Sequence, residues 1–162
     1  RANHSRLLEY MKNGGTYVVQ YNGVASSPCT TRPEHVEHIG PFPLKIASLR
    51  VTVEQAPVTF PHPGHLVLRM PNKITEKDFE GWIQERGLYF ASEWDPRYES
   101  LLESHDPGDK PQSGGALYTK YGKGAYIFTG YAFFRQLPAG VPGAYRLFAN
   151  FLSAGKSAPS GP

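Results

Sequence analysis

Hydrophobic positions recur at helical spacing in two segments, one near each end of the chain. Leu7, Leu8 and Met11 share a face of a helix predicted over residues 4–12, which the pair Gly14-Gly15 ends. A second helix is predicted over residues 143–153 from an apolar stripe made of Ala144, Leu147, Phe148, Phe151 and Leu152. We expect both helices to pack on a sheet, with Phe148 mostly buried.

An apolar run without polar alternation follows the first helix. TYVVQY (16–21) is typical of a strand that is buried on both faces, and it predicts a central position in a mainly parallel sheet. Helix, two glycines and buried strand form the second half of a βαβ unit, and no earlier strand precedes them. The first residue is also not Met. We therefore expect this chain to be an N-terminally truncated piece of a longer protein.

The middle of the chain alternates loops with short strands. Residues 22–45 read as a loop, and alternation predicts a strand over 48–55. Further short strands are predicted over 66–68, 88–90 and 99–104, and a hairpin is predicted within 114–130, with its turn at 121–124. Together with the two helices, these segments predict a three-layer α/β domain over 1–155, followed by a flexible tail over 156–162.

The segment ITEKDFEGWIQERG carries a clear helix start. Thr75 and Asp78 have the spacing of an N-cap and its partner, and Ile74 with Phe79 is placed for a hydrophobic staple. The pattern predicts a helix that Gly87 ends, with Trp82 on its buried face.

Charge and composition exclude several classes of partner. The 17 basic and 14 acidic residues give a net charge of +3, and the basic residues are scattered, which does not favour nucleic acid or a membrane surface. No apolar run has the length of a membrane span. Cys29 is the single cysteine, so an intrachain disulfide is excluded.

Several small motifs could in principle carry chemistry. His35 and His38, beside Glu34 and Glu37, resemble part of a metal site but lack a third ligand, and His62 with His65 lacks a carboxylate. Cys29 has no glycine neighbours that would form a nucleophile turn, and Gly122-Lys123-Gly124 precedes no helix that could bind phosphate. We expect loops and a hairpin turn here, with no metal or cofactor in this chain.

Residues 82–98 (WIQERGLYFASEWDPRY) combine aromatic and ionisable side chains more densely than the rest of the chain. Trp82 and Phe90 are interpreted as core residues. The turn at Asp95-Pro96 does not need a neighbouring Trp, so a polar and aromatic surface is predicted there. The candidate ligand-binding residues are Glu85, Arg86, Trp94, Asp95 and Tyr98. A structural surface cluster is the alternative.

Long stretches of the sequence resemble a known family. PNKITEKDFEGWIQERGLYFASEWDPRY and YGKGAYIFTGYAFFRQLPAGVPGAYRLFANFLS, with GGTYVVQYN, IGPFPLK and RVTVEQAPV, are similar to the C-terminal region of large bacterial PIG-L (LmbE-like) deacetylases. The resemblance covers about Arg1 to Leu152. It implies an accessory domain of the class I glutamine amidotransferase-like or ThuA-like type, with a flavodoxin-like sheet, that follows a zinc-dependent N-acetylglucosamine deacetylase domain.

The family's catalytic motifs are missing from this chain. Its zinc site uses a His-Pro-Asp-Asp motif, whereas His62-Pro63-Gly64-His65 lacks both aspartates, so zinc is expected only in the parent's deacetylase domain. The resemblance implies a non-catalytic domain that supports the enzyme domain or binds a glycan. The alternatives are a cryptic hydrolase, using Cys29 or a serine with His35, His38 or His105, and an oligomerisation module that forms homo-oligomers. The compartment of the parent protein is not indicated.

Overall fold

The computed structural model describes residues 3–23 and 39–156. The described helices are α1 (His4–Lys12), α2 (Phe133–Gln136) and α3 (Pro142–Ser153), with 3-10 turns η2 (Leu66–Leu68), η3 (Glu76–Phe79) and η4 (Ala154–Lys156). The strands are β1 (Thr16–Gln20), β2 (Leu44–Val51), β3 (Val58–Thr59), β4 (Gly87–Trp94), β5 (Glu99–Ser104), β6 (Gln112–Tyr121) and β7 (Gly124–Thr129). The chain is therefore an α/β protein, as the sequence predicts.

The main sheet has the strand order β1-β7-β6-β5-β3, and β2 pairs with β4 in a separate sheet. Only the β1–β7 pair is parallel among the described strands, while β6–β7, β5–β6, β3–β5 and β2–β4 are antiparallel. The prediction of a mainly parallel sheet is wrong for this part of the chain. The physical reason is the tight hairpin between β6 and β7, because a connection that short can only join antiparallel strands.

The position of β1 differs from the prediction as well. Residues 16–20 form a strand, but it lies at the edge of the sheet and not in its centre. Its side chains are half-buried from Thr16 to Val19. The strand contacts a core on each face, through Val18 on one face and Tyr17 and Val19 on the other, but it is only partly buried and not fully buried as predicted. The apolar run carries no information about which strand pairs with it.

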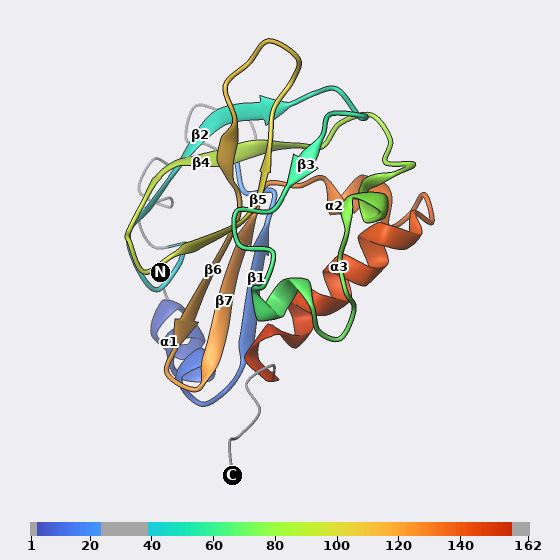
Figure 1. Ribbon diagram of the computed structural model, residues 1–162. Coiled ribbons are helices and arrows are strands. Elements are labelled where there is room, and N and C mark those ends of the chain that lie inside the picture. The colour runs from blue at the N-terminus through green and yellow to red at the C-terminus, as the bar shows by residue number, and fades with distance from the viewer. Residues whose placement is uncertain (1–2, 24–38, 157–162) are drawn as a thin grey trace.

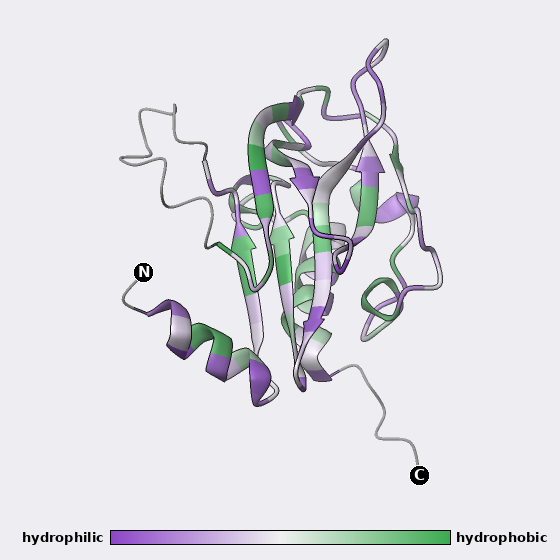
Figure 2. Ribbon diagram, turned by 90° about the vertical axis from the view of Figure 1, so that its left-hand side faces the viewer, coloured by the Kyte–Doolittle hydropathy of each residue, from purple (hydrophilic) through white to green (hydrophobic). Residues whose placement is uncertain are grey.

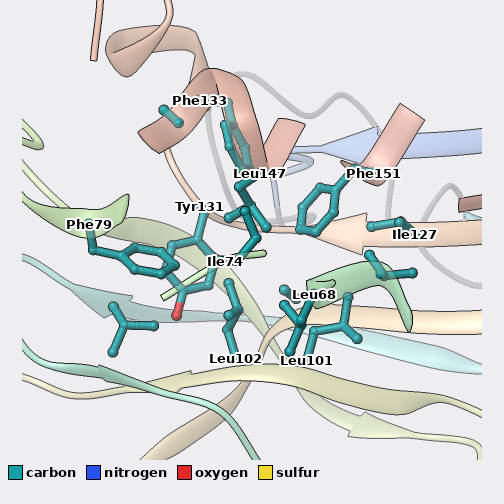
Figure 3. Packing of buried hydrophobic residues seen from close by; sticks show 14 of the residues in the cluster. Leu68, Ile74, Phe79, Leu101, Leu102, Ile127, Tyr131, Phe133, Leu147 and Phe151 are labelled. Atoms are coloured by element: carbon teal, nitrogen blue, oxygen red, sulfur yellow. The ribbon is translucent and has the colours of Figure 1, made fainter. Parts of the chain in front are cut away.

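Side chains from the two faces of the main sheet form two separate cores. Helix α1 lies on one side of the sheet and α3 on the other (Figure 1). In β7, Tyr126 and Phe128 point into the core with Met11 of α1, whereas Ala125 and Ile127 point into the core with α3. Figure 2, coloured by hydropathy, accordingly shows apolar residues on α1 and on the strands of the sheet. The larger core, on the α3 side, gathers aromatic and aliphatic side chains from strands, helices and 3-10 turns (Figure 3).

The two terminal helices match their predicted ranges closely. Helix α1 ends before Gly14, and α3 begins at Pro142, which suits the first helical position. The stripe on α3 buries Ala144, Leu147 and Phe151, as expected from the spacing, but its last predicted member, Leu152, is 55% exposed. Phe148 packs against the border of the same core, where its ring centre lies 5.4 Å from that of Phe133, so it is mostly buried, as predicted.

The predicted helix over 75–86 is wrong beyond its first turn. The N-cap prediction holds, since the Thr75 backbone N–H donates to Asp78 Oδ2 at 2.8 Å in a capping box. The segment leaves the helical path after Phe79, and Gly81 and Gln84 have positive φ values of 71° and 66°. Two side chains take over the hydrogen bonds that the helix would have made. Trp82 Nε1 donates to Asp78 O at 3.0 Å, and Arg86 Nη1 donates to Phe79 O.

Two fully buried amides hold the irregular segments against the C-terminal helices. Gln136 accepts from Ile83 N at 2.9 Å and donates to Ile83 O at 3.0 Å. Asn150 donates to Val67 O and to Asn72 O, both at 2.8 Å. Because buried main-chain groups without partners are costly, these amides replace the ladder that regular structure would supply.

Two further strand predictions are shifted or replaced. The strand predicted over 48–55 begins earlier, as β2 at Leu44, and ends at Val51. Residues 66–68 form the turn η2 in place of a strand, because His65 Nδ1 accepts from Val67 N at 3.2 Å and caps that turn.

Candidate functional site

The structure does not bring the five predicted ligand-binding residues onto one surface. Glu85 and Arg86 precede β4, whereas Trp94, Asp95 and Tyr98 lie at its other end. A strand of this length separates its ends by roughly 20 Å. The two ends therefore need separate descriptions.

Arg86 and Tyr98 are buried, each to 4% exposure, and both bind main-chain carbonyls. Arg86 Nε donates to Ala56 O at 3.0 Å, and its guanidinium lies 5.8 Å from the ring centres of Phe79 and Trp82. Tyr98 Oη donates to Phe42 O at 2.9 Å. Burial lowers the pKa of Arg86 and raises the pKa of Tyr98 to about 12. Neither side chain offers a free surface to a ligand.

Glu85 belongs to a polar cluster at the carboxyl ends of the parallel strands β1 and β7. Its Oε1 accepts from Tyr21 Oη at 2.7 Å and from Arg135 Nε at 3.1 Å. Arg135 also donates to Gln84 Oε1. Burial, reinforced by the Glu85 carboxylate, raises the pKa of Tyr21, so the phenol stays protonated and acts as a donor.

Left-handed backbone conformation is concentrated in the same cluster. Tyr21, Gln84 and Tyr89 have φ values of 51°, 66° and 64°, and they are the described non-glycine residues with positive φ. The rings of Tyr21 and Tyr89 are 5.4 Å apart, and the ring of Phe134 is 4.5 Å from that of Tyr21. Such conformations are costly and persist only where the surroundings over-determine them. Here the ion pair and the aromatic contacts supply that constraint.

Trp94 lies beside an open hollow of about 560 Å³. The ring is half-buried and packs against the α1-side core. The hollow runs between the end of β4, the start of β6 and the turn before β6, and its lining residues are Leu49, Ala91, Ser92, Trp94, Asp109, Lys110, Pro111, Gln112, Ser113 and Gly114. Asp109 and Lys110 bring opposite charges, so the lining is close to neutral overall. The arrangement suits an uncharged ligand with one flat apolar face.

A hydrogen-bonded turn fixes the charged wall of this hollow. Asp106 accepts from Thr52 N at 2.9 Å, Thr52 Oγ1 at 2.7 Å and Val53 N at 2.8 Å. Partial burial acts to raise the pKa of Asp106, but the hydrogen bonds from Thr52 and Val53 outweigh it and lower the pKa. Asp109 N then donates to Asp106 O at 3.0 Å, which closes the turn that carries Asp109 and Lys110.

The floor of the hollow depends on a close crossing of β4 and β6. A Cβ at Gly114 would overlap the carbonyl of Ala91, so only glycine allows this approach. Next to it, Gln112 Nε2 donates to Arg50 O at 3.0 Å. Gln112 Oε1 is shielded from solvent and has no hydrogen-bond partner in residues 3–23 and 39–156. Gln112 lines the hollow, but its Oε1 atom is not exposed to the solvent in it.

Asp95 is near Trp94 but is held by its own neighbour. Arg97 donates to Asp95 from Nε and Nη2, both at 2.7 Å, and the hydrogen bond from Arg97 lowers the pKa of Asp95 to about 2. The guanidinium of Arg97 also lies 3.5 Å from the centre of the Phe42 ring. This arrangement stabilises the turn after β4 and leaves Trp94 as the predicted residue that borders the hollow.

Among the other candidate motifs, His65 has a carboxylate neighbour in the described structure, since its Nε2 lies 3.9 Å from Glu99 Oε2. His65 caps η2 through Nδ1, and His105 Nδ1 lies 3.0 Å from Asp106 O. Gly122-Lys123 is a hairpin turn, as expected. Cys29, His35 and His38 lie outside the described residues. Within the described ranges, no three His, Cys, Asp or Glu side chains are grouped to hold a metal ion, and no helix has the length and apolarity needed to cross a membrane.

The sequence pointed to Trp94 but not to the residues opposite it. Asp109, Lys110 and Gln112 lie in a stretch, HDPGDKPQ, whose glycine and prolines indicate a turn. That signal predicts a loop and not its position beside β4. Comparison with protein-family models, with curated proteins and with solved structures found no match for this chain.

Proposed function

We propose that this chain is a non-catalytic accessory domain that holds a glycan beside Trp94, in support of an N-acetyl sugar deacetylase. The proposal joins two lines of support. The resemblance to the C-terminal region of PIG-L deacetylases implies the enzyme partner, and the hollow beside Trp94 offers room for a sugar ring. Zinc belongs, in this proposal, to the parent's deacetylase domain. A relation to amidotransferase-like domains is part of the same proposal, but the mostly antiparallel pairing of the described strands does not support a flavodoxin-like sheet.

The observation that carries the proposal is a half-buried indole ring at the side of an open, nearly neutral hollow. The C–H face of a pyranose ring packs on an aromatic ring, while its hydroxyl groups need nearby donors and acceptors. Ser92, Asp109 and Lys110 supply such groups within the same lining.

The hollow favours weak binding of a neutral sugar. A single shallow aromatic wall corresponds to a Kd of about 1 mM, or about 4 kcal/mol. The experiment is an NMR titration of the chain with chitin oligosaccharides, in which amide shifts should concentrate at residues 91–94 and 109–114. Trp94→Ala should weaken binding at least about five-fold, because an aromatic contact contributes about 1 kcal/mol or more.

Tyr145→Ala is the matched control, since Tyr145 is an exposed aromatic residue on α3 outside the hollow. This variant should bind as the parent chain does. If the Trp94→Ala variant folds and binds the sugar as tightly as the parent chain, the proposal that this hollow binds a glycan is wrong. A parallel titration with the purified deacetylase domain then tests whether the same surface docks on the enzyme domain.

A further inference from the structure

The two edges of the main sheet are protected to very different degrees. At one edge, β3 has only two residues, Val58 and Thr59, and prolines stand at positions 57 and 61. Short strands and prolines are the devices by which sheet edges avoid pairing with other chains. At the other edge, β1 has five residues, Thr-Tyr-Val-Val-Gln, with no charge and no proline. The β1 edge therefore lacks these devices.

Hydrogen bonds to β7 show which main-chain groups of β1 face outward. Ala125 N donates to Gly15 O at 3.1 Å, and Tyr21 N donates to Thr129 O at 2.8 Å. In a parallel pair, alternate residues point to the same neighbour, so residues 15, 17, 19 and 21 face β7. The N–H and C=O groups of Thr16, Val18 and Gln20 then point away from β7. No described strand pairs with them.

Both faces of β1 are already covered, so the open part is its edge. Helices α1 and α3 both contact β1, from opposite sides of the sheet (Figure 1). Strand β1 is the outer strand of the main sheet, and its central residues Tyr17, Val18 and Val19 stand between the polar residues Thr16 and Gln20. This is the environment of an interior strand, except that one neighbour is absent from the described structure.

The most exposed large hydrophobic side chains lie on the same two helices. Tyr10 on α1 and Leu152 on α3 are each 55% exposed. The Tyr10 ring lies against Gly15, immediately before β1. Gly155 N, just beyond Leu152, donates to Thr16 Oγ1 at 2.9 Å. The Tyr10 ring therefore lies close to the start of β1, and the segment that follows α3 is hydrogen-bonded to the same end of the strand.

We propose that the β1 edge is a self-association surface, on which β1 of a second copy pairs in antiparallel orientation. A twofold axis at Val18 places Thr16 opposite Gln20 of the other copy, and such isologous contacts are the commonest form of oligomer. The pairing would add about six main-chain hydrogen bonds. No like charges meet along the strand, which makes it self-complementary. This inference does not depend on glycan binding at the Trp94 hollow.

The test compares two substitutions at Gln20, whose side chain is exposed. Gln20→Pro removes an outward N–H without touching the ladder to β7, whereas Gln20→Ala removes only the side chain. Sedimentation equilibrium over about a hundred-fold range of concentration should show a monomer–dimer equilibrium for the parent chain. Gln20→Pro should weaken dimerisation at least about ten-fold, and Gln20→Ala by less than about two-fold.

Hydrogen exchange provides a second measurement that does not depend on the proline variant folding. Amide protection of Val18 and Gln20 in the parent chain should rise with protein concentration, while protection of Val58 in β3 should not. A parent chain that stays monomeric throughout the concentration range overturns the proposal. A dimer that leaves Val18 and Gln20 unprotected overturns it equally, because the contact would then use another face.

Discussion

The two ends of residues 82–98 have similar composition and opposite environments. At the first end, Trp82 is 3% exposed and Arg86 is buried with its guanidinium on carbonyl oxygens. At the second end, Trp94 is half-buried beside an open hollow, and Arg97 is exposed and paired with Asp95. Each end therefore presents a Trp and an Arg, yet one pair is structural and the other borders solvent.

The difference follows from the state of the nearby main chain. After Phe79 the backbone leaves the helical path, so the carbonyls of Asp78 and Phe79 need donors from elsewhere. The Trp82 indole and the Arg86 guanidinium supply them, which draws both side chains inward. Trp94 lies on a paired strand, where Leu44 stands opposite it and the main chain is already hydrogen-bonded. Its side chain is free for other contacts.

The largest expected effect comes from exchanging the two tryptophans for alanine. Trp82→Ala removes a buried ring from the α3-side core together with the donor to Asp78 O, and should lower the free energy of unfolding by about 3–5 kcal/mol. Trp94→Ala should cost less than about 2 kcal/mol, because the ring is partly solvated in the folded state. Urea unfolding of both variants measures the difference. Equal losses would mean that both ends belong to the core.

Sequence patterns predicted the elements well where the main chain is regular. The helix α3, the strand β5 and the β6–β7 hairpin follow directly from spacing and turn residues, whereas β4 was predicted only over residues 88–90. The helix over 75–86 failed although its cap was correct, because Gln136 and Arg86 stabilise an irregular path that no local signal records. The conformation of this segment is therefore determined largely by hydrogen bonds to residues that are distant in the sequence.

The candidate site was predictable to a smaller extent than the fold. Trp94 was identified because a turn does not need a tryptophan, and that argument uses only neighbouring residues. Asp109 and Lys110 reach the same hollow because Asp106 binds the end of β2, 53 to 54 residues earlier in the chain. The edge position of β1 likewise depends on β7, which comes near the other end of the chain.

A smaller effect is expected at the Glu85 side of the comparison. Tyr21→Phe removes the donor to Glu85 and leaves the ring contacts with Tyr89 and Phe134, so it should lower the free energy of unfolding by about 1 kcal/mol. Tyr145→Phe is the control, since the Tyr145 hydroxyl donates to the neutral carbonyl of Leu137 from an exposed side chain, whereas the Tyr21 hydroxyl donates to a carboxylate. That change should cost about 0.5 kcal/mol, the low end of the range for a hydrogen bond. Urea unfolding of both variants is the measurement, and equal costs would argue against a constrained cluster around Glu85.

The smallest effect on stability is expected at the Trp94 side, from the turn that Asp106 anchors. The pKa of Asp106 is lower in the folded chain than in the unfolded one, so the carboxylate contributes stability above its unfolded pKa of about 3.9. That contribution is lost as the pH falls through the folded pKa. Asp106→Asn should therefore lower the free energy of unfolding by less than about 1 kcal/mol at neutral pH, and the difference from the parent chain should shrink below about pH 4.

The same substitution also tests how the hollow is built. The amide introduced by Asp106→Asn keeps one acceptor for Thr52 or Val53 but not the three charge-assisted bonds, so the turn that carries Asp109 and Lys110 should loosen. Urea unfolding across pH measures the stability difference, and amide exchange of residues 109–112 measures the turn. A pH-independent difference between the two chains would contradict the role of the ionised carboxylate. Unchanged exchange would show that the wall beside Trp94 is held by the β5–β6 pairing, in which Gln112 is opposite Ser104, and not by Asp106.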